Sequence, residues 1–180
     1  MDHTEAIVQI NNMIDNNFCE EIIKFMNQKS LEQMETLGGM DINTRNVLGY
    51  SLDFKHRDKI ISDKIIKTIE KLYTYYKFKF FKMTNFKVSQ IELLKYEING
   101  KYDIHTDHLY EAIRQISVII NLNNDYEGGD LIFTDQKEKE IKRLKLGKGS
   151  IVFFPSNFMY PHGIQPITKG TRYSIVAWLF

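Results

Sequence analysis

The chain has 180 residues, of which 43% are hydrophobic and 26% charged, and its net charge is +1. These values are typical of one soluble globular domain with a sizeable core. The near-neutral charge excludes a global electrostatic attraction to nucleic acid or to an anionic membrane.

Compartment is indicated by the cysteine content and by the start of the sequence. Cys19 is the only cysteine, so no internal disulfide can form, and this favours a reducing compartment. The first residues lack the basic start and apolar core of a signal peptide, and no apolar run approaches the roughly 20 residues of a membrane span. We therefore expect a soluble, intracellular (cytoplasmic) protein with no membrane partner.

Residues 1–84 are expected to form a mainly helical support region. Asp15 or Asn16 can cap a helix that runs to about residue 28, with apolar residues along one face. A second helix is expected from about Asp58 to Tyr75, because isoleucines and a leucine recur there at spacings of three and four.

The segment 73–82, YTYYKFKFFK, mixes aromatic residues with lysines. Such a mixture can bind single-stranded nucleic acid by stacking and charge. A strand over 76–82 with its lysines in water explains the alternation equally simply, and we favour that interpretation. We expect no nucleic-acid partner.

Residues 85–180 have the pattern of short strands, apolar and rich in β-branched and aromatic residues. The strands are expected at 88–96, 115–122, 131–133, 141–146, 150–154, 163–166 and 172–180. Strands at this spacing indicate a sandwich or barrel, here with helices packed outside. We find no linker or repeat, and predict a single domain, 1–180, in which 85–180 supplies most of the β core.

Two histidines and one aspartate suggest a metal site. His105 and Asp107 are two residues apart in KYDIHTDH, so on a strand both side chains would leave by one face. His162 follows a strongly apolar strand. Two imidazoles and a carboxylate form the facial set that binds Fe(II) in non-haem oxygenases and leaves three positions open. Each histidine could instead be an ordinary loop or core residue.

Arg172 opens the otherwise apolar last strand, and Ser174 shares its strand face. A buried guanidinium needs a partner, and a ligand carboxylate would be a suitable one. An edge arginine with its head in solvent explains the pattern as well.

Together these segments resemble the 2-oxoglutarate- and Fe(II)-dependent oxygenases of the prolyl 4-hydroxylase type. The resemblance runs from about Val88 to the C-terminus, through SQIELLKYEINGKYDIHTD, RQISVIINLNNDYEGGDLIF and LGKGSIVFFPSNFMYPHGIQPITKGTRYSIVAWLF. It implies a mainly β fold with flanking α-helices around a double-stranded β-helix, the jelly roll that cupins share.

The resemblance also implies roles for individual residues. His105, Asp107 and His162 would bind Fe(II). Arg172 would bind the distal carboxylate of 2-oxoglutarate, Tyr96 would donate its hydroxyl to the same group, and Ser174 would add a hydrogen bond. Arg45, in NTRNVLGYSL, resembles an arginine on the substrate side of the family's site.

The implied reaction converts 2-oxoglutarate and O2 to succinate and CO2 while a C–H bond of a prolyl or other residue in a peptide or protein is hydroxylated, with ascorbate as a reductant. Many prolyl 4-hydroxylases carry Lys where this chain has Arg172, and this leaves the substrate open. The same chemistry on a free amino acid or small molecule is one alternative. A non-catalytic metal- or ligand-binding jelly roll is another.

Two neighbouring features bear on these alternatives. We expect His108 to be a polar residue near the site and not a metal ligand. Nucleic-acid-repair oxygenases carry a second arginine six residues after the first, where this chain has Trp178, so a repair demethylase is disfavoured. The segments 38–53 and 108–114 are the candidate substrate loops; neither the substrate nor the oligomeric state follows from the sequence.

Overall fold

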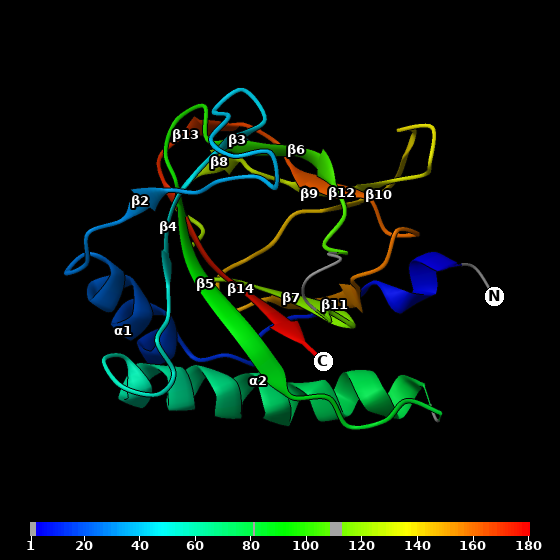
Figure 1. Ribbon diagram of the computed structural model, residues 1–180, viewed down its shortest axis with the longest axis horizontal. Helices are drawn as coiled ribbons and strands as arrows, with labels where there is room; N and C mark the ends of the chain where they lie inside the picture. The colour runs from blue at the N-terminus through cyan, green and yellow to red at the C-terminus, as the bar shows by residue number, and fades with distance from the viewer. Residues whose placement is uncertain (1–2, 81, 109–112) are drawn as a thin grey trace.

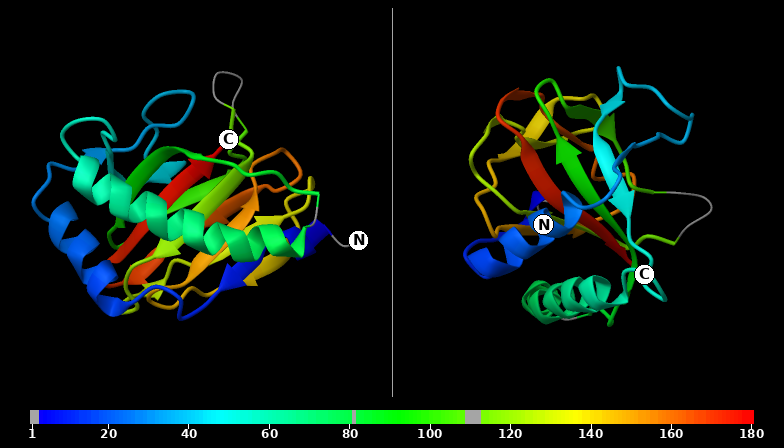
Figure 2. Two further views of the ribbon diagram at one scale, coloured as in Figure 1. Left: turned by 90° about the horizontal axis from the view of Figure 1, so that it is seen from below. Right: turned by 90° about the vertical axis from the view of Figure 1, so that its left-hand side faces the viewer.

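The computed structural model describes residues 3–80, 82–108 and 113–180. Two antiparallel sheets lie one above the other, and two helices cover the outer face of the larger sheet (Figures 1 and 2). The helices are α1 (Asn16–Met26) and α2 (Lys59–Lys79), preceded by a short 3-10 turn, η1 (His3–Ala6).

The larger sheet has seven strands. In spatial order they are β1 (Val8–Ile10), β11 (Ile151–Pro155), β7 (Ile116–Asn121), β14 (Arg172–Leu179), β5 (Val88–Tyr96), β4 (Leu48–Ser51) and β2 (Glu32–Gln33).

The smaller sheet has five strands, and two further strands form a separate pair. The five are β10 (Glu140–Leu144), β9 (Leu131–Thr134), β12 (His162–Ile164), β6 (Lys101–His105) and β3 (Arg45–Asn46); the pair is β13 (Ile167–Lys169) with β8 (Glu127–Gly128).

Both faces of the larger sheet are buried, each against a different partner. Along β14, Ile175, Ala177 and Leu179 join the cluster that packs against the helices. Val176 alternates with them and packs in the second cluster, between the two sheets. This period of two explains why the central strands read as continuous apolar runs in the sequence. Polar residues on the inner face of this sheet point between the sheets, and that is where the site forms.

The first helix and the long strands lie where the sequence places them. Asp15 caps α1, accepting a hydrogen bond of 2.8 Å from the Phe18 amide. The strand β5 covers the expected residues 88–96, and β14 begins at Arg172 as expected.

The strand expected over 76–82 is wrong, because α2 continues to Lys79. Tyr73 and Tyr76 extend the buried face of the helix at a spacing of three, and the Tyr76 ring stacks on Phe153 of β11. The Lys–Phe alternation is compatible with a strand or a helix. The packing of Tyr73 and Tyr76 favours the helix. Residue 81 lies outside the described residues.

The sequence prediction also missed short strands. Residues 1–84 contain β1, β2, β3 and β4 in addition to the helices. Of these, β3 and β4 are consecutive in the chain yet belong to different sheets, and so link the two. The single domain 1–180 stays a prediction. Across the described residues, no helix combines the length and apolar character needed to cross a membrane.

Candidate metal centre and cosubstrate pocket

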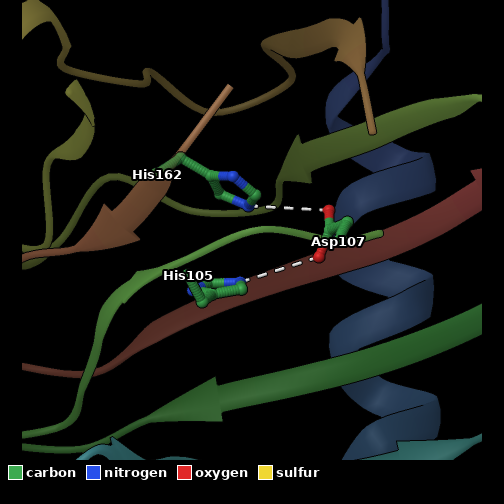
Figure 3. Close-up of side chains that lie close together, drawn as sticks. All are labelled: His105, Asp107 and His162. Carbon is green, nitrogen blue, oxygen red and sulfur yellow. Dashed lines mark ion pairs between the residues drawn. The ribbon is translucent and has the colours of Figure 1, made fainter. Parts of the chain in front are cut away.

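The three candidate metal ligands converge between the sheets (Figure 3). His105 ends β6, Asp107 follows two residues later, and His162 opens β12, whose pairing with β6 sets it opposite His105. His105 Nε2 lies 3.6 Å from Asp107 Oδ1, and His162 Nε2 lies 3.5 Å from Asp107 Oδ2. All three ligand atoms fall within 4.8 Å of one another, so one ion can contact all of them.

The backbone fixes which nitrogen of each histidine faces this point. His105 Nδ1 lies 2.8 Å from the carbonyl oxygen of Asp103, and His162 Nδ1 lies 3.0 Å from that of Tyr160. A carbonyl oxygen only accepts hydrogen bonds, so each Nδ1 carries the proton and donates it. Each Nε2 therefore presents a lone pair toward Asp107, as metal binding requires.

Burial keeps His162 neutral. Desolvation lowers the pKa of this imidazole from 6.5 to about 4, against the opposing pull of Asp107. Neutral imidazole is the form that binds metal, so near pH 7 the site needs no deprotonation of this ligand.

Asp107 is held as a carboxylate. Burial alone would raise its pKa, but His162, His105 and a hydrogen bond from Ser117 lower it below the usual range. Ser117 contributes through its Oγ, which donates to Asp107 Oδ2 at 2.6 Å. Ser117 lies 2.8 Å from the Ser156 hydroxyl, which fixes its orientation.

Arg172 is buried beneath the triad, so the solvent-exposed alternative considered for it is wrong. Its side chain is 1% exposed, and its Nε donates to Asn121 Oδ1 at 3.1 Å. Its Nη2 is buried and has no hydrogen-bond partner in the part of the chain that the structure describes. No carboxylate within residues 3–80, 82–108 and 113–180 forms an ion pair with it. A guanidinium in this state is suited to the carboxylate of a ligand.

Ser174 and Tyr96 lie beside Arg172 in the same cavity as the triad. Ser174 Oγ is also buried without a partner. Tyr96 pairs with Arg172 across β5 and β14, and its ring centre is 5.1 Å from the guanidinium carbon. Burial raises the pKa of the Tyr96 phenol, so the hydroxyl stays a donor. The cavity floor therefore presents hydrogen-bond donors to a polar ligand.

Arg45 lies at the cavity mouth and not on its floor. From β3, its Nη2 forms a 3.0 Å ion pair with Glu92, and its guanidinium covers the Tyr102 ring at 4.7 Å. Tyr102 in turn stacks on His105 with 3.6 Å between ring centres. Arg45 thus contacts the residue that supports a candidate ligand, on the side open to a substrate. His108 is exposed and lies outside the triad, as expected.

Residues 91–180 match the model of a known family, the 2OG-Fe(II) oxygenase superfamily. The chain belongs to this superfamily. The resemblance to prolyl 4-hydroxylase-like oxygenases is thereby confirmed, with Fe(II) as the family's cofactor and 2-oxoglutarate as its cosubstrate. The His105–Asp107–His162 group fits such an iron site. Ascorbate as reductant stays a prediction.

Curated relatives match part of the chain. A PKHD-type hydroxylase of Idiomarina loihiensis is 30% identical over 97 residues, which are 52% of this chain and 43% of that protein. Human prolyl 3-hydroxylase 2 is 35% identical over 68 residues, 37% of this chain and 10% of that protein. The chain thus spans less than half the length of these relatives.

Solved structures resemble nearly the whole chain. A Pseudomonas putida prolyl-4-hydroxylase has a TM-score of 0.76 at 16% identity, covering 96% of this chain and 91% of that chain. A Trichoplax adhaerens prolyl hydroxylase, solved with a hypoxia inducible factor peptide fragment, has a TM-score of 0.79 at 16% identity, covering 98% and 84%. These likenesses confirm the double-stranded β-helix fold.

Several residues of the site were not predicted from the sequence. Ser117, Asn121 and Glu92 are polar residues within apolar strands, and each faces inward. Their positions in β7 and β5 are the signal that could have found them, because a buried polar residue on an inner face needs a partner. Arg114 and the indole of Trp178 were also missed as possible binding groups.

Proposed function

We propose that this protein is an Fe(II)- and 2-oxoglutarate-dependent dioxygenase that hydroxylates a prolyl or other residue in a peptide or protein. His105, Asp107 and His162 hold the iron. Arg172, with Ser174 and Tyr96, holds the distal carboxylate of 2-oxoglutarate. One observation carries the proposal: a three-residue metal group and a buried guanidinium, whose Nη2 has no hydrogen-bond partner among the described residues, line one cavity.

Each residue of the proposed site has a role that follows from its position. When bound, iron and 2-oxoglutarate supply oxidative decarboxylation of the cosubstrate coupled to hydroxylation of a C–H bond. Two neutral imidazoles and one carboxylate leave the remaining metal positions open to ligands. Arg172 fixes the far end of the cosubstrate, because its guanidinium can hold a carboxylate with two hydrogen bonds. Ser117 orients the Asp107 carboxylate.

Relatives support the substrate class. Human prolyl 3-hydroxylase 2 is 35% identical over 68 residues, and the Trichoplax structure contains a peptide. In this chain a second cavity opens outward from the triad, lined by Arg45, Tyr102 and Arg114 among others. A peptide segment entering there would meet the metal from the side opposite to Arg172.

The test is turnover with Fe(II), 2-oxoglutarate, ascorbate and O2 on a panel of proline-containing peptides. Succinate formation and the gain of one oxygen atom in the peptide are measured by mass spectrometry. His162→Ala is expected to abolish both, because it removes a metal ligand. The matched control is His56→Ala, which changes an exposed histidine far from the triad in sequence. Full activity in His162→Ala would show that the metal assignment is wrong.

A further inference from the structure

The cavity mouth carries a second set of buried donors that the proposed cosubstrate site does not use. Arg45 Nε, Arg114 Nε and Trp178 Nε1 are all buried, and none has a hydrogen-bond partner among residues 3–80, 82–108 and 113–180. All three residues line the outer cavity together with His105 and Asp107. We call Arg45, Arg114 and Trp178 the donor wall.

The charge of Arg114 lacks a counter-ion. Its Nη2 donates to the neutral amide of Gln90 at 2.7 Å, and its guanidinium lies 3.7 Å from the centre of the Trp178 ring. In the parts of the chain that the structure describes, no carboxylate lies within ion-pair distance of it. Arg45, by contrast, is neutralised by Glu92 at 3.0 Å. Among the described residues, the donor wall therefore has one guanidinium, that of Arg114, without an ion pair.

The chemistry of the donor wall selects its ligand. Guanidinium and indole nitrogens only donate hydrogen bonds, so the ligand must present acceptors. An uncompensated, partly buried cation favours an anionic acceptor over a neutral carbonyl. A carboxylate satisfies both conditions.

Arg114 and Arg172 lie in different cavities: Arg114 lines the outer one and Arg172 the inner one. Trp178 and Arg172 lie six residues apart on β14, which at the rise of a strand separates their backbones by about 20 Å. The residues that line both cavities include His105, Asp107, Arg45 and Trp178. One 2-oxoglutarate bound to the metal and to Arg172 would leave Arg114 free for the other substrate.

We propose that the donor wall binds a carboxylate of the hydroxylated substrate, close to the reacting carbon. This rests on the proposed function for the identity of the metal site and deepens it by naming the substrate's chemistry. The carboxylate can be the free α-carboxylate of a terminal or free residue, or the side chain of an acidic residue next to it.

The chain contains its own reporter for the test. Trp178 is the only tryptophan, so fluorescence excited where tyrosine does not absorb reports on the donor wall alone. The protein is loaded with Zn(II), which accepts the same ligand types without redox chemistry, and is saturated with 2-oxoglutarate. Three probes are titrated: N-acetyl-alanyl-proline, its C-terminal amide, and that peptide extended by an aspartate and ending in an amide.

The free acid is expected to bind at least about tenfold more tightly than the plain amide, since hydrogen bonds to a charged group are among the stronger ones. If an acidic side chain is the source, the aspartate-extended amide binds as tightly as the acid; if the α-carboxylate is the source, it binds as weakly as the plain amide. Arg114→Gln is expected to bring all three affinities together. The control Arg143→Gln, on edge strand β10, changes an arginine that pairs with Asp130 and Glu140 and keeps the preference.

Equal affinities in the wild-type protein, no fluorescence change with any probe, or a carboxylate preference that survives Arg114→Gln would overturn the proposal. The fold of Arg114→Gln is checked by circular dichroism and by its binding of 2-oxoglutarate. Anaerobic binding of 2-oxoglutarate to the Fe(II) protein is measured separately. If 2-oxoglutarate does not bind, the proposed function is contradicted, but the preference of the donor wall for a carboxylate can still be measured.

Discussion

Each histidine of the triad is oriented by a single backbone carbonyl. Because Nδ1 donates to that carbonyl, Nε2 is left to face Asp107 on both His105 and His162. The sequence could predict which three residues form the group, since His-x-Asp and a later histidine are visible in it. It could not predict the role of Ser117, which depends on the face of β7 that meets the cavity. Nor could it predict the role of Arg114, which depends on where the preceding loop ends.

The buried imidazole of His162 makes the metal-free protein sensitive to acid. Its pKa in the folded protein is about 4, below the ordinary 6.5, so the unfolded chain binds more protons between these values. The free energy of unfolding should therefore fall as the pH is lowered from about 6.5 to about 4. Above pH 6.5 His162 is neutral in both states, and the protein has its full stability with respect to this group. Denaturant midpoints of the metal-free protein, measured across this pH window, test this expectation.

The matched variant for that experiment is His162→Gln, which keeps a polar side chain but cannot titrate. Its unfolding free energy should vary less with pH across the same window. An unchanged pH dependence would show that another group is responsible.

At the scale of the elements, the site depends on how closely β12 approaches β6. Gly163 follows His162, and a Cβ there would lie 2.8 Å from the backbone oxygen of Tyr102. Backbone on a central strand cannot move away without carrying His105 with it. The absence of a side chain at 163 thus sets the distance between the two histidines.

Gly163→Ala is accordingly expected to weaken metal binding by about tenfold or more, because small displacements of metal ligands are costly. Metal affinity is measured by competition with a chromogenic chelator. Gly147→Ala is the control, since its added Cβ would meet only the Ser150 hydroxyl at an ordinary 3.7 Å. Equal metal affinity in Gly163→Ala and wild type would contradict the packing argument.

The elements also show where sequence patterns are sufficient. Long strands such as β5 were predicted closely, because a run of residues from Ile91 to Leu94 is buried on both faces of the sheet. The short strands β3 and β4 carry too few residues for a period to appear. The last turn of α2 was predicted as a strand, because lysines alternate with phenylalanines there. This alternation hides the helical spacing of the aromatic residues that pack on the sheet.

At the scale of the whole molecule, two hydrophobic clusters share the strands of one sheet. Helices α1 and α2 pack on its outer face and the smaller sheet on its inner face. The two clusters lie on opposite faces of the same four strands, β5, β7, β11 and β14. Loss of packing in one cluster therefore exposes one face of the strands on which the other cluster also depends. The single domain over 1–180 is tested by how the protein unfolds.

We therefore predict a single cooperative unfolding transition. Ile69 of α2 is completely buried, and Ile69→Ala should lower the free energy of unfolding by about 2–5 kcal/mol. Circular dichroism, which reports the helices, and Trp178 fluorescence, which reports the donor wall, should shift together. Lys67→Ala, exposed on the same helix, should change stability by no more than about 0.5 kcal/mol. Separate midpoints for the two probes would indicate two independently folding units.

Substrate choice is the property least readable from the sequence. Of the expected substrate segments, 38–53 contains Arg45 and borders the outer cavity, while 109–112 lie outside the described residues. Loops carry no period, so only the fold shows that Arg114 and Trp178 meet at the cavity mouth.

The central claim is that one cavity holds Fe(II) at the triad and 2-oxoglutarate against Arg172. An anaerobic titration of the Fe(II) protein with 2-oxoglutarate, followed through the visible metal-to-ligand charge-transfer band, tests it without knowledge of the substrate. We predict a saturable band that is lost in His105→Ala and needs about 10- to 100-fold more 2-oxoglutarate in Arg172→Gln, since a hydrogen-bonded charge is removed. Bound iron without any band, or an unchanged titration in Arg172→Gln, would contradict the account.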